Sequence, residues 1–98
     1  MSVYVDDIFD CPGPRGYSRW CHMIADTIDE LHEMADKIGH KRSWFQDKPR
    51  FAHYDLTPSR RRLAVKYGAI EVSAKEIVAI SRRAIVIAAL KAVGEVVE

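Results

Sequence analysis

The most regular pattern of apolar and polar positions lies between Thr27 and Gly39. Apolar residues recur there every three or four positions, the spacing of a helix that buries one face, at Ile28, Leu31, Met34, Ala35 and Ile38. Thr27 followed by Glu30 is the residue pair of a capping box, and Gly39 is a common helix stop. The pattern therefore predicts an amphipathic helix between these two ends.

Two further helices are predicted in the second half of the chain. Thr57 and Pro58 suit the cap and first turn of a helix that ends at Gly68. We expect its inward face to consist of Leu63, Ala64 and Tyr67. Ser73 with Glu76 is another capping box and opens the third helix.

The far half of this third helix, residues 84–93, is apolar on almost every side. Such a helix needs to be buried, and a small domain has little interior to offer it. We therefore expect residues 77–98 to form an apolar C-terminal helix that makes a homo-oligomer. The β-branched run Ile85-Val86-Ile87 leaves an edge strand as the alternative.

Short β-prone segments separate the helices, at residues 3–5, 22–25, 51–55 and 70–72. Strands that alternate with helices are typical of α/β domains with parallel sheets. The order predicts one small α/β domain over residues 1–98, with about four short, mostly parallel strands and three helices.

Composition agrees with one folded domain. The chain has 98 residues, of which 48% are hydrophobic and 30% are charged, which excludes disorder. No apolar run approaches the ~20 residues that span a bilayer. The first ten residues hold no basic residue, so we expect no export signal and a cytoplasmic location with Cys11 and Cys21 reduced.

The net charge of +1 conceals a division along the chain. Residues 1–36 hold eight acids and two bases, whereas residues 37–66 hold nine bases and two acids. This division indicates local fields rather than an affinity for polyanions in general. Because nucleic-acid-binding domains are usually basic overall, we do not expect a nucleic-acid partner.

Three predicted strands end in carboxylates, at Asp6, Asp26 and Asp55. The carboxyl ends of parallel strands meet at one edge of a sheet, where ligands bind. These aspartates would there hold Mg²⁺ or Mn²⁺, with His22 or His53 as general base. The alternative is that the aspartates only end strands or assist helix caps, and that the histidines belong to the core.

The stretch HYDLTPSRRR carries Arg60 and Arg61 into the first turn of a predicted helix. Positive charge there opposes the helix dipole unless an anion offsets it. A phosphate or carboxylate site is therefore one interpretation, and a solvated helix face is the other.

Two loops mix basic and aromatic residues. KRSWFQDKPR contains Arg42 and Trp44, and PGPRG with its flanks contains Arg15 and Arg19. Such pairs stack bases and hold phosphates, although Trp44 with Phe45 would equally well pin its loop to the core. PGPRG lacks the ending of a phosphate-binding Walker loop. The cysteine and histidine spacings predict neither a Cys–His dyad nor a zinc site.

The segments VYVDD, CHMIADTIDELHEMADKIG, WFQ, HYDLTPSRRRLAV and YGAIEVS resemble a family of short bacterial and phage proteins catalogued as a domain of unknown function. The resemblance covers residues 2–76. It implies that His22, Asp26, Trp44, His53, Tyr54 and Asp55 occupy motif positions, and it implies no activity. Its occurrence in phages implies a role in conflict between phage and host.

Three functions follow from these features. The first is a non-catalytic binder of a phosphorylated ligand, a nucleotide, which in a phage would sequester a host immune signal. We expect the ligand to contact Arg15, Arg19, Arg42, Trp44, His53, Tyr54, Arg60 and Arg61. The second is a Mg²⁺- or Mn²⁺-dependent phosphohydrolase or nuclease that uses the strand-end aspartates. The third is a protein-interaction module that acts through the C-terminal helix.

Overall fold

The computed structural model describes the backbone of residues 2–97 and the side chains of residues 2–91. Its sheet has five strands: β1 (Val3–Val5), β2 (Phe9–Asp10), β3 (Arg19–Ala25), β4 (Tyr54–Leu56) and β5 (Ile70–Glu71). The central strand is β3, which pairs antiparallel with β1, β2 and β4, while β5 pairs parallel with β1. The predicted α/β class with three helices is confirmed.

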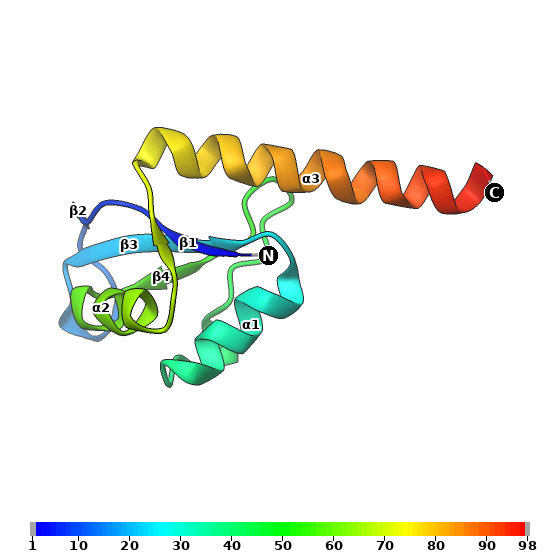
Figure 1. Cartoon of the computed structure of the whole chain (residues 1–98). Helices are drawn as coiled ribbons and strands as arrows, with labels where there is room; N and C mark the ends of the chain where they lie inside the picture. The colour runs from blue at the N-terminus through cyan, green and yellow to red at the C-terminus, as the bar shows by residue number, and fades with distance from the viewer. Residues whose placement is uncertain (1, 98) are drawn as a thin grey trace.

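The helices lie on both sides of this sheet (Figure 1). On one side are α1 (Ile28–Lys37) and α2 (Pro58–Lys66), and across the other passes α3 (Ala74–Val97). Because side chains alternate along a strand, Cys21 and Met23 of β3 enter the core with Leu31 and Ala64. The intervening residues of β3, including His22, face the side of α3.

The sheet is mostly antiparallel, which corrects the expectation of mostly parallel strands. No helix separates β1 from β3, and the short β2 segment lets the chain return beside β1 in the opposite direction. The sequence pattern also missed β2. The consequence matters for the site, because the carboxyl ends of β1 and β3 lie at opposite ends of the sheet.

The three predicted helix starts agree with the structure, and two of them carry the expected side-chain capping bonds. Thr27 Oγ1 accepts a hydrogen bond from the Glu30 amide at 3.2 Å, and Ser73 and Glu76 make both bonds of a capping box at 3.0 and 3.1 Å. Thr57 is the N-cap of α2 but makes no side-chain capping bond. Tyr67, expected to face inward, is half exposed, because α2 ends there and the chain turns away.

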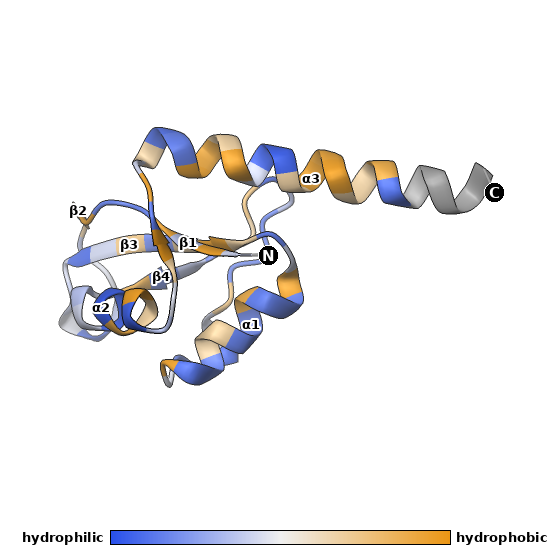
Figure 2. Ribbon diagram, in the orientation of Figure 1, coloured by the Kyte–Doolittle hydropathy of each residue, from blue (hydrophilic) through white to orange (hydrophobic). Residues whose placement is uncertain are grey.

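The C-terminal apolar segment is not buried within the chain, and its expected association with another copy stays a prediction. Residues 84–90 are helical, which excludes the edge strand, yet Leu90 is 65% exposed and Val86 55% exposed. Helix α3 extends past the sheet (Figure 1), and apolar residues recur on it up to residue 90 (Figure 2). Within residues 2–97, no helix combines the length and apolar character needed to cross a membrane.

Candidate functional site

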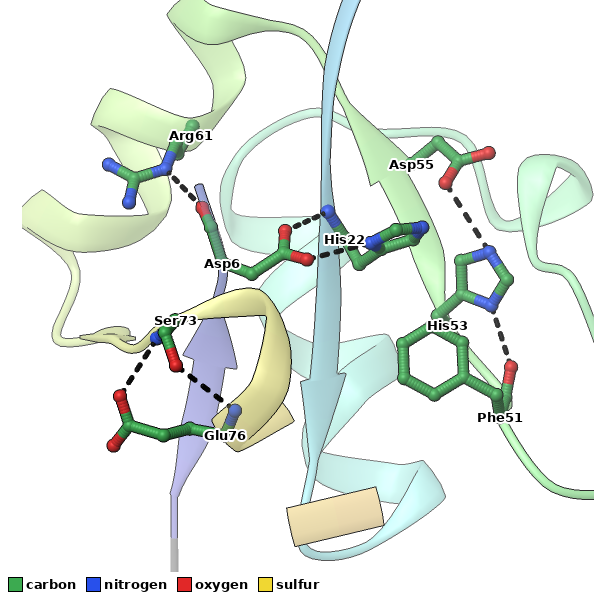
Figure 3. A network of polar contacts seen from close by, with 8 residues as sticks. All are labelled: Asp6, His22, Phe51, His53, Asp55, Arg61, Ser73 and Glu76. Atoms are coloured by element: carbon green, nitrogen blue, oxygen red, sulfur yellow. Dashed lines mark hydrogen bonds and ion pairs between the residues drawn. The ribbon is translucent and has the colours of Figure 1, made fainter. Parts of the chain in front are cut away.

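Four polar residues lie on one face of the sheet, across β1, β3 and β4. His22 pairs with Asp55, and His53 lies two residues before Asp55, so the three side chains share a face. Val5 pairs with Met23, which brings Asp6 opposite His22. Strand register therefore gathers residues that are up to 49 positions apart in the chain. Figure 3 shows the group.

Asp6 fixes the position of His22. One carboxylate oxygen accepts the His22 backbone N–H at 2.6 Å, and the other lies 2.8 Å from His22 Nδ1. Asp6 is only 1% exposed, and its carbonyl accepts a hydrogen bond from Arg61 Nε at 2.8 Å. The hydrogen bond to Asp6 raises the pKa of His22 above its ordinary value, although burial acts in the opposite direction. Because a carboxylate only accepts hydrogen bonds, Nδ1 carries the proton of this bond, and Nε2 points away from Asp6.

His53 is oriented in a similar way. Its Nδ1 donates to the Phe51 carbonyl at 2.6 Å, and its Nε2 lies 3.3 Å from Asp55 Oδ1. The other oxygen of Asp55 accepts a hydrogen bond from Gln46. Burial raises the pKa of Asp55, but the hydrogen bond and charge of His53 outweigh it, so that the pKa lies below its ordinary value.

One potential ligand atom each from His22, His53 and Asp55 lies within 4.8 Å of the others. Two ligands about 2.1 Å from a tetrahedral metal ion are about 3.4 Å apart. The 3.3 Å between His53 Nε2 and Asp55 Oδ1 fits this value. The side chains of His22 and Asp55 are about one-third exposed, at 30% and 32%, so the group is open to solvent.

The structure does not bring Asp26 to this group. Asp26 follows β3 at the opposite end of the sheet, where it accepts hydrogen bonds from the Ser2 amide at 2.8 Å and the Tyr4 hydroxyl at 3.2 Å. Asp6, Asp26 and Asp55 therefore do not converge, because β1 and β3 run in opposite directions. The buried thiol of Cys21, whose pKa burial raises to about 12, faces the core below His22.

The arginines expected to contact a phosphate are dispersed. Four of them bind protein oxygens: Arg19 pairs with Asp10, Arg42 with Asp36, Arg61 with Glu71, and Arg60 donates to the Ile38 carbonyl. Arg15 lines a pocket, with its guanidinium 4.0 Å from the centre of the Trp44 ring. Tyr54 is buried, and its hydroxyl lies 2.8 Å from His32 Nδ1.

This pocket has a volume of about 270 Å³ and adjoins the histidine–aspartate group. Gln46 and Asp55 form one wall, and the remaining walls include Phe9, Trp20, Trp44 and His40. His40 is 5% exposed, and its Nδ1 has no hydrogen-bond partner among the described residues. Burial lowers the pKa of His40 to about 4, helped by the charges of Arg60 and Arg15, so the ring is neutral at pH 7.

Sequence reasoning missed His40, Gln46 and the pairing of Asp6 with His22. The WFQ segment offered a signal for Gln46, but nothing local distinguishes His40 from a loop residue after a helix. His22 and His53 were predicted to act near one metal ion, yet the spacing of cysteines and histidines predicted no zinc-type site. Spacing along the chain does not reveal this group of residues, because they come from different strands.

Comparisons with known proteins give a family and no activity. No curated protein and no solved structure is detectably similar to the chain. The profile of the family DUF4031, described as a protein of unknown function, matches residues 3–84. This match confirms the resemblance seen in the motifs, and it includes the group around His22 and the first part of α3. The chain therefore belongs to the DUF4031 family.

Proposed function

We propose that the protein is a metal-dependent hydrolase of phosphate esters, with a divalent transition-metal ion bound by His22, His53 and Asp55. One observation carries the proposal: both imidazoles have Nδ1 held by an acceptor, and their other nitrogens lie with a carboxylate in one small volume. Histidines that bind metals usually donate their second nitrogen in this way.

The donor set determines which metals to expect. Two imidazoles and one carboxylate suit Zn²⁺, Mn²⁺, Fe²⁺ or Co²⁺, whereas Mg²⁺ prefers oxygen ligands. This set differs from the three aspartates expected from the sequence. Asp6 would not bind the metal itself. Its hydrogen bond orients His22 and makes that imidazole a stronger ligand.

Three protein ligands leave a position for water, whose pKa the metal lowers to about 7. The resulting hydroxide would attack phosphorus, and the bond between phosphorus and the leaving alkoxide oxygen would break. The proton lost by the water is recovered by the leaving oxygen, so the products are a phosphate and an alcohol. Arg15, in the adjoining pocket, supplies positive charge for the substrate.

The first experiment is calorimetric titration of chelator-treated protein with Zn²⁺ and Mn²⁺, followed by hydrolysis of bis(p-nitrophenyl) phosphate with each metal. We expect one metal ion per chain, and loss of binding in His53→Ala. Asp26→Asn and His32→Asn are matched controls, because they change the same residue types outside the group. A wild-type chain that binds neither metal would contradict the proposal.

The same experiment separates this proposal from the sequestering binder. A binder retains its phosphorylated ligand intact, whereas a hydrolase releases product. Sequestration of a host nucleotide signal by a phage protein stays a prediction. Activity that survives thorough chelation would instead assign the chemistry to the His22–Asp6 and His53–Asp55 pairs as acid and base.

A second proposal concerns the C-terminal helix, which we propose associates with the same helix of another copy. It is supported by large apolar side chains exposed on α3, namely Ile85, Val86, Ile87 and Leu90. Exposed apolar surface of this extent on a helix that extends beyond its domain is typical of an interaction surface. Association would make the protein a homo-oligomer.

A further inference from the structure

We infer that the pocket lined by Trp20, Trp44 and His40 accepts one nucleobase. The substrate of the proposed hydrolase would then be a nucleoside phosphate, with the phosphate at His22, His53 and Asp55. The position of the phosphate rests on the proposed function, whereas the base site rests on the pocket itself.

The walls and size of the pocket suit one planar ring. Phe9, Trp20 and Trp44 all line it, and aromatic side chains stack on bases of any sequence. Its volume of about 270 Å³ lies just below the ~300–1,000 Å³ of pockets that enclose drug-sized ligands. A single base fits such a space, but the two bases of a dinucleotide would not both be enclosed.

His40 provides an edge that a base can recognise. Buried polar atoms in folded proteins almost always have hydrogen-bond partners, yet His40 Nδ1 has none among the described residues. A neutral imidazole offers one N–H donor and one acceptor nitrogen. The edge of a nucleobase carries both kinds of group beside its stacking face. Nδ1 is closed to solvent in this structure, so the ring must turn toward the pocket for a base to supply the missing partner, which an aliphatic ligand could not supply.

Arg15 adds a planar cation to the pocket. Its guanidinium lies 4.0 Å from the centre of the Trp44 ring and 5.9 Å from that of Trp20. The residue has a φ of 60°, in the left-handed region that non-glycine residues seldom adopt. Gly13, Pro14 and Tyr17 hold this turn through hydrogen bonds of 2.9 and 3.3 Å. A guanidinium kept in this position can stack on a base or bind the attached phosphate.

The base pocket and the proposed metal group adjoin each other. Asp55 and Gln46 line the pocket, and their side chains are bonded to each other within the proposed metal group. A ligand with its base in the pocket, against the Arg15 guanidinium, therefore has its phosphate side directed to a wall that the metal group shares. A nucleoside phosphate contains both parts in one molecule, whereas a simple sugar phosphate would use only the metal group.

Intrinsic fluorescence tests the base site directly, because both tryptophans of the chain line this pocket. The full chain is titrated with adenosine and uridine, then with their 5′-monophosphates and ribose 5-phosphate, with and without Zn²⁺. We expect the nucleosides to quench the fluorescence without metal. With Zn²⁺, at least one nucleotide should bind tenfold or more tightly than ribose 5-phosphate.

His40→Leu removes the unpartnered nitrogen while keeping an apolar side chain of moderate size. We expect nucleoside affinity to fall tenfold or more with an unchanged or higher melting temperature, since a residue kept for stability would lower it. Tyr67→Leu removes a half-exposed aromatic residue at the end of α2 that does not line the pocket, and it should leave the affinity unchanged.

The outcomes separate the two proposals. Nucleosides that do not quench, equal affinity for ribose 5-phosphate and the nucleotides, or wild-type affinity in His40→Leu would each overturn the base site. Metal binding with hydrolysis of a simple phosphodiester would still support the proposed function in those cases. Quenching by nucleosides in a chain that binds no metal would support the base site and contradict the proposed function.

Discussion

The face of the sheet around His22 and the far half of α3 differ in how their side chains are covered. Around His22, Asp6, Phe51 and Gln46 hold the ring nitrogens and carboxylate oxygens in fixed positions. On α3, Val86 and Leu90 are more than half exposed, although solvent is the least favourable environment for them. Contacts within the chain organise the first region, whereas the large apolar side chains of the second have few such contacts among the described residues.

The largest expected effect tests the organised region. Asp6→Ala removes a buried carboxylate and leaves the His22 amide and Nδ1 without their acceptor. We expect the free energy of unfolding to fall by about 3 kcal/mol, and metal affinity to fall by about 10–100-fold. Urea denaturation and calorimetric titration measure the two effects.

Asp7→Ala is the matched control, because Asp7 is adjacent and exposed. It should change the free energy of unfolding by less than about 0.5 kcal/mol. Equal losses of unfolding free energy in both variants would mean that Asp6 contributes only general negative charge. The region around His22 would then not be organised by the Asp6 hydrogen bonds.

The next effect tests the exposed region. Leu90→Glu places a charge on the most exposed of the large apolar side chains on α3. If α3 self-associates, the dissociation constant should rise tenfold or more, which corresponds to about 1.4 kcal/mol. Sedimentation velocity over a range of concentrations measures it.

Lys91→Glu changes the charge at the neighbouring exposed position and should have a smaller effect on association. Both variants should melt at nearly the wild-type temperature when dilute, because neither residue is buried in the chain. A wild-type protein that remains monomeric at all concentrations would refute self-association through α3.

A smaller effect concerns the start of α3, which connects the two regions. Ser73→Ala removes the side-chain acceptor of the Glu76 amide and should lower the free energy of unfolding by about 1 kcal/mol. Ser73→Asp retains an acceptor and should restore most of the loss. Thermal unfolding followed by circular dichroism measures both, and equal stability of all three proteins would contradict a stabilising role for the Ser73 cap.

The smallest effect is a dependence on pH. Hydrogen bonds from Ser73 lower the pKa of Glu76 below its ordinary value, so its carboxylate binds protons less readily in the folded chain. The stabilisation is complete above the ordinary pKa of glutamate and is lost as the pH falls through the lowered value. Glu76→Gln should therefore flatten the stability profile in this acidic range, and an unchanged profile would contradict the role of Glu76.

The parts of the fold that depend on local sequence were predictable. The first helix and the cap at Ser73 each follow from residues within a few positions of one another. Strand direction was not predictable, because it depends on how distant segments pair. The three strand-end aspartates looked equivalent in sequence, and the antiparallel pairing of β1 with β3 separates Asp26 from the others.

In the candidate site, only the arrangement of residues that are close in the sequence was predictable. His53 and Asp55 are two positions apart in a β-prone segment, so a common face follows from the sequence. The addition of His22 requires the register between β3 and β4, which the sequence does not specify. His40 follows a helix that was predicted well, but its buried position depends on Trp44 and Tyr54, which pack on its ring from other parts of the chain.

The two cysteines differ in their reactivity toward thiol reagents. Thiol reagents attack the thiolate, and the Cys21 thiol is buried with a pKa of about 12, so at neutral pH it is almost wholly protonated. Cys11 is exposed and is one of the residues that line the pocket of Trp20, Trp44 and His40. A maleimide dye therefore labels the folded chain at Cys11, which places a spectroscopic reporter beside the pocket without any change to the sequence.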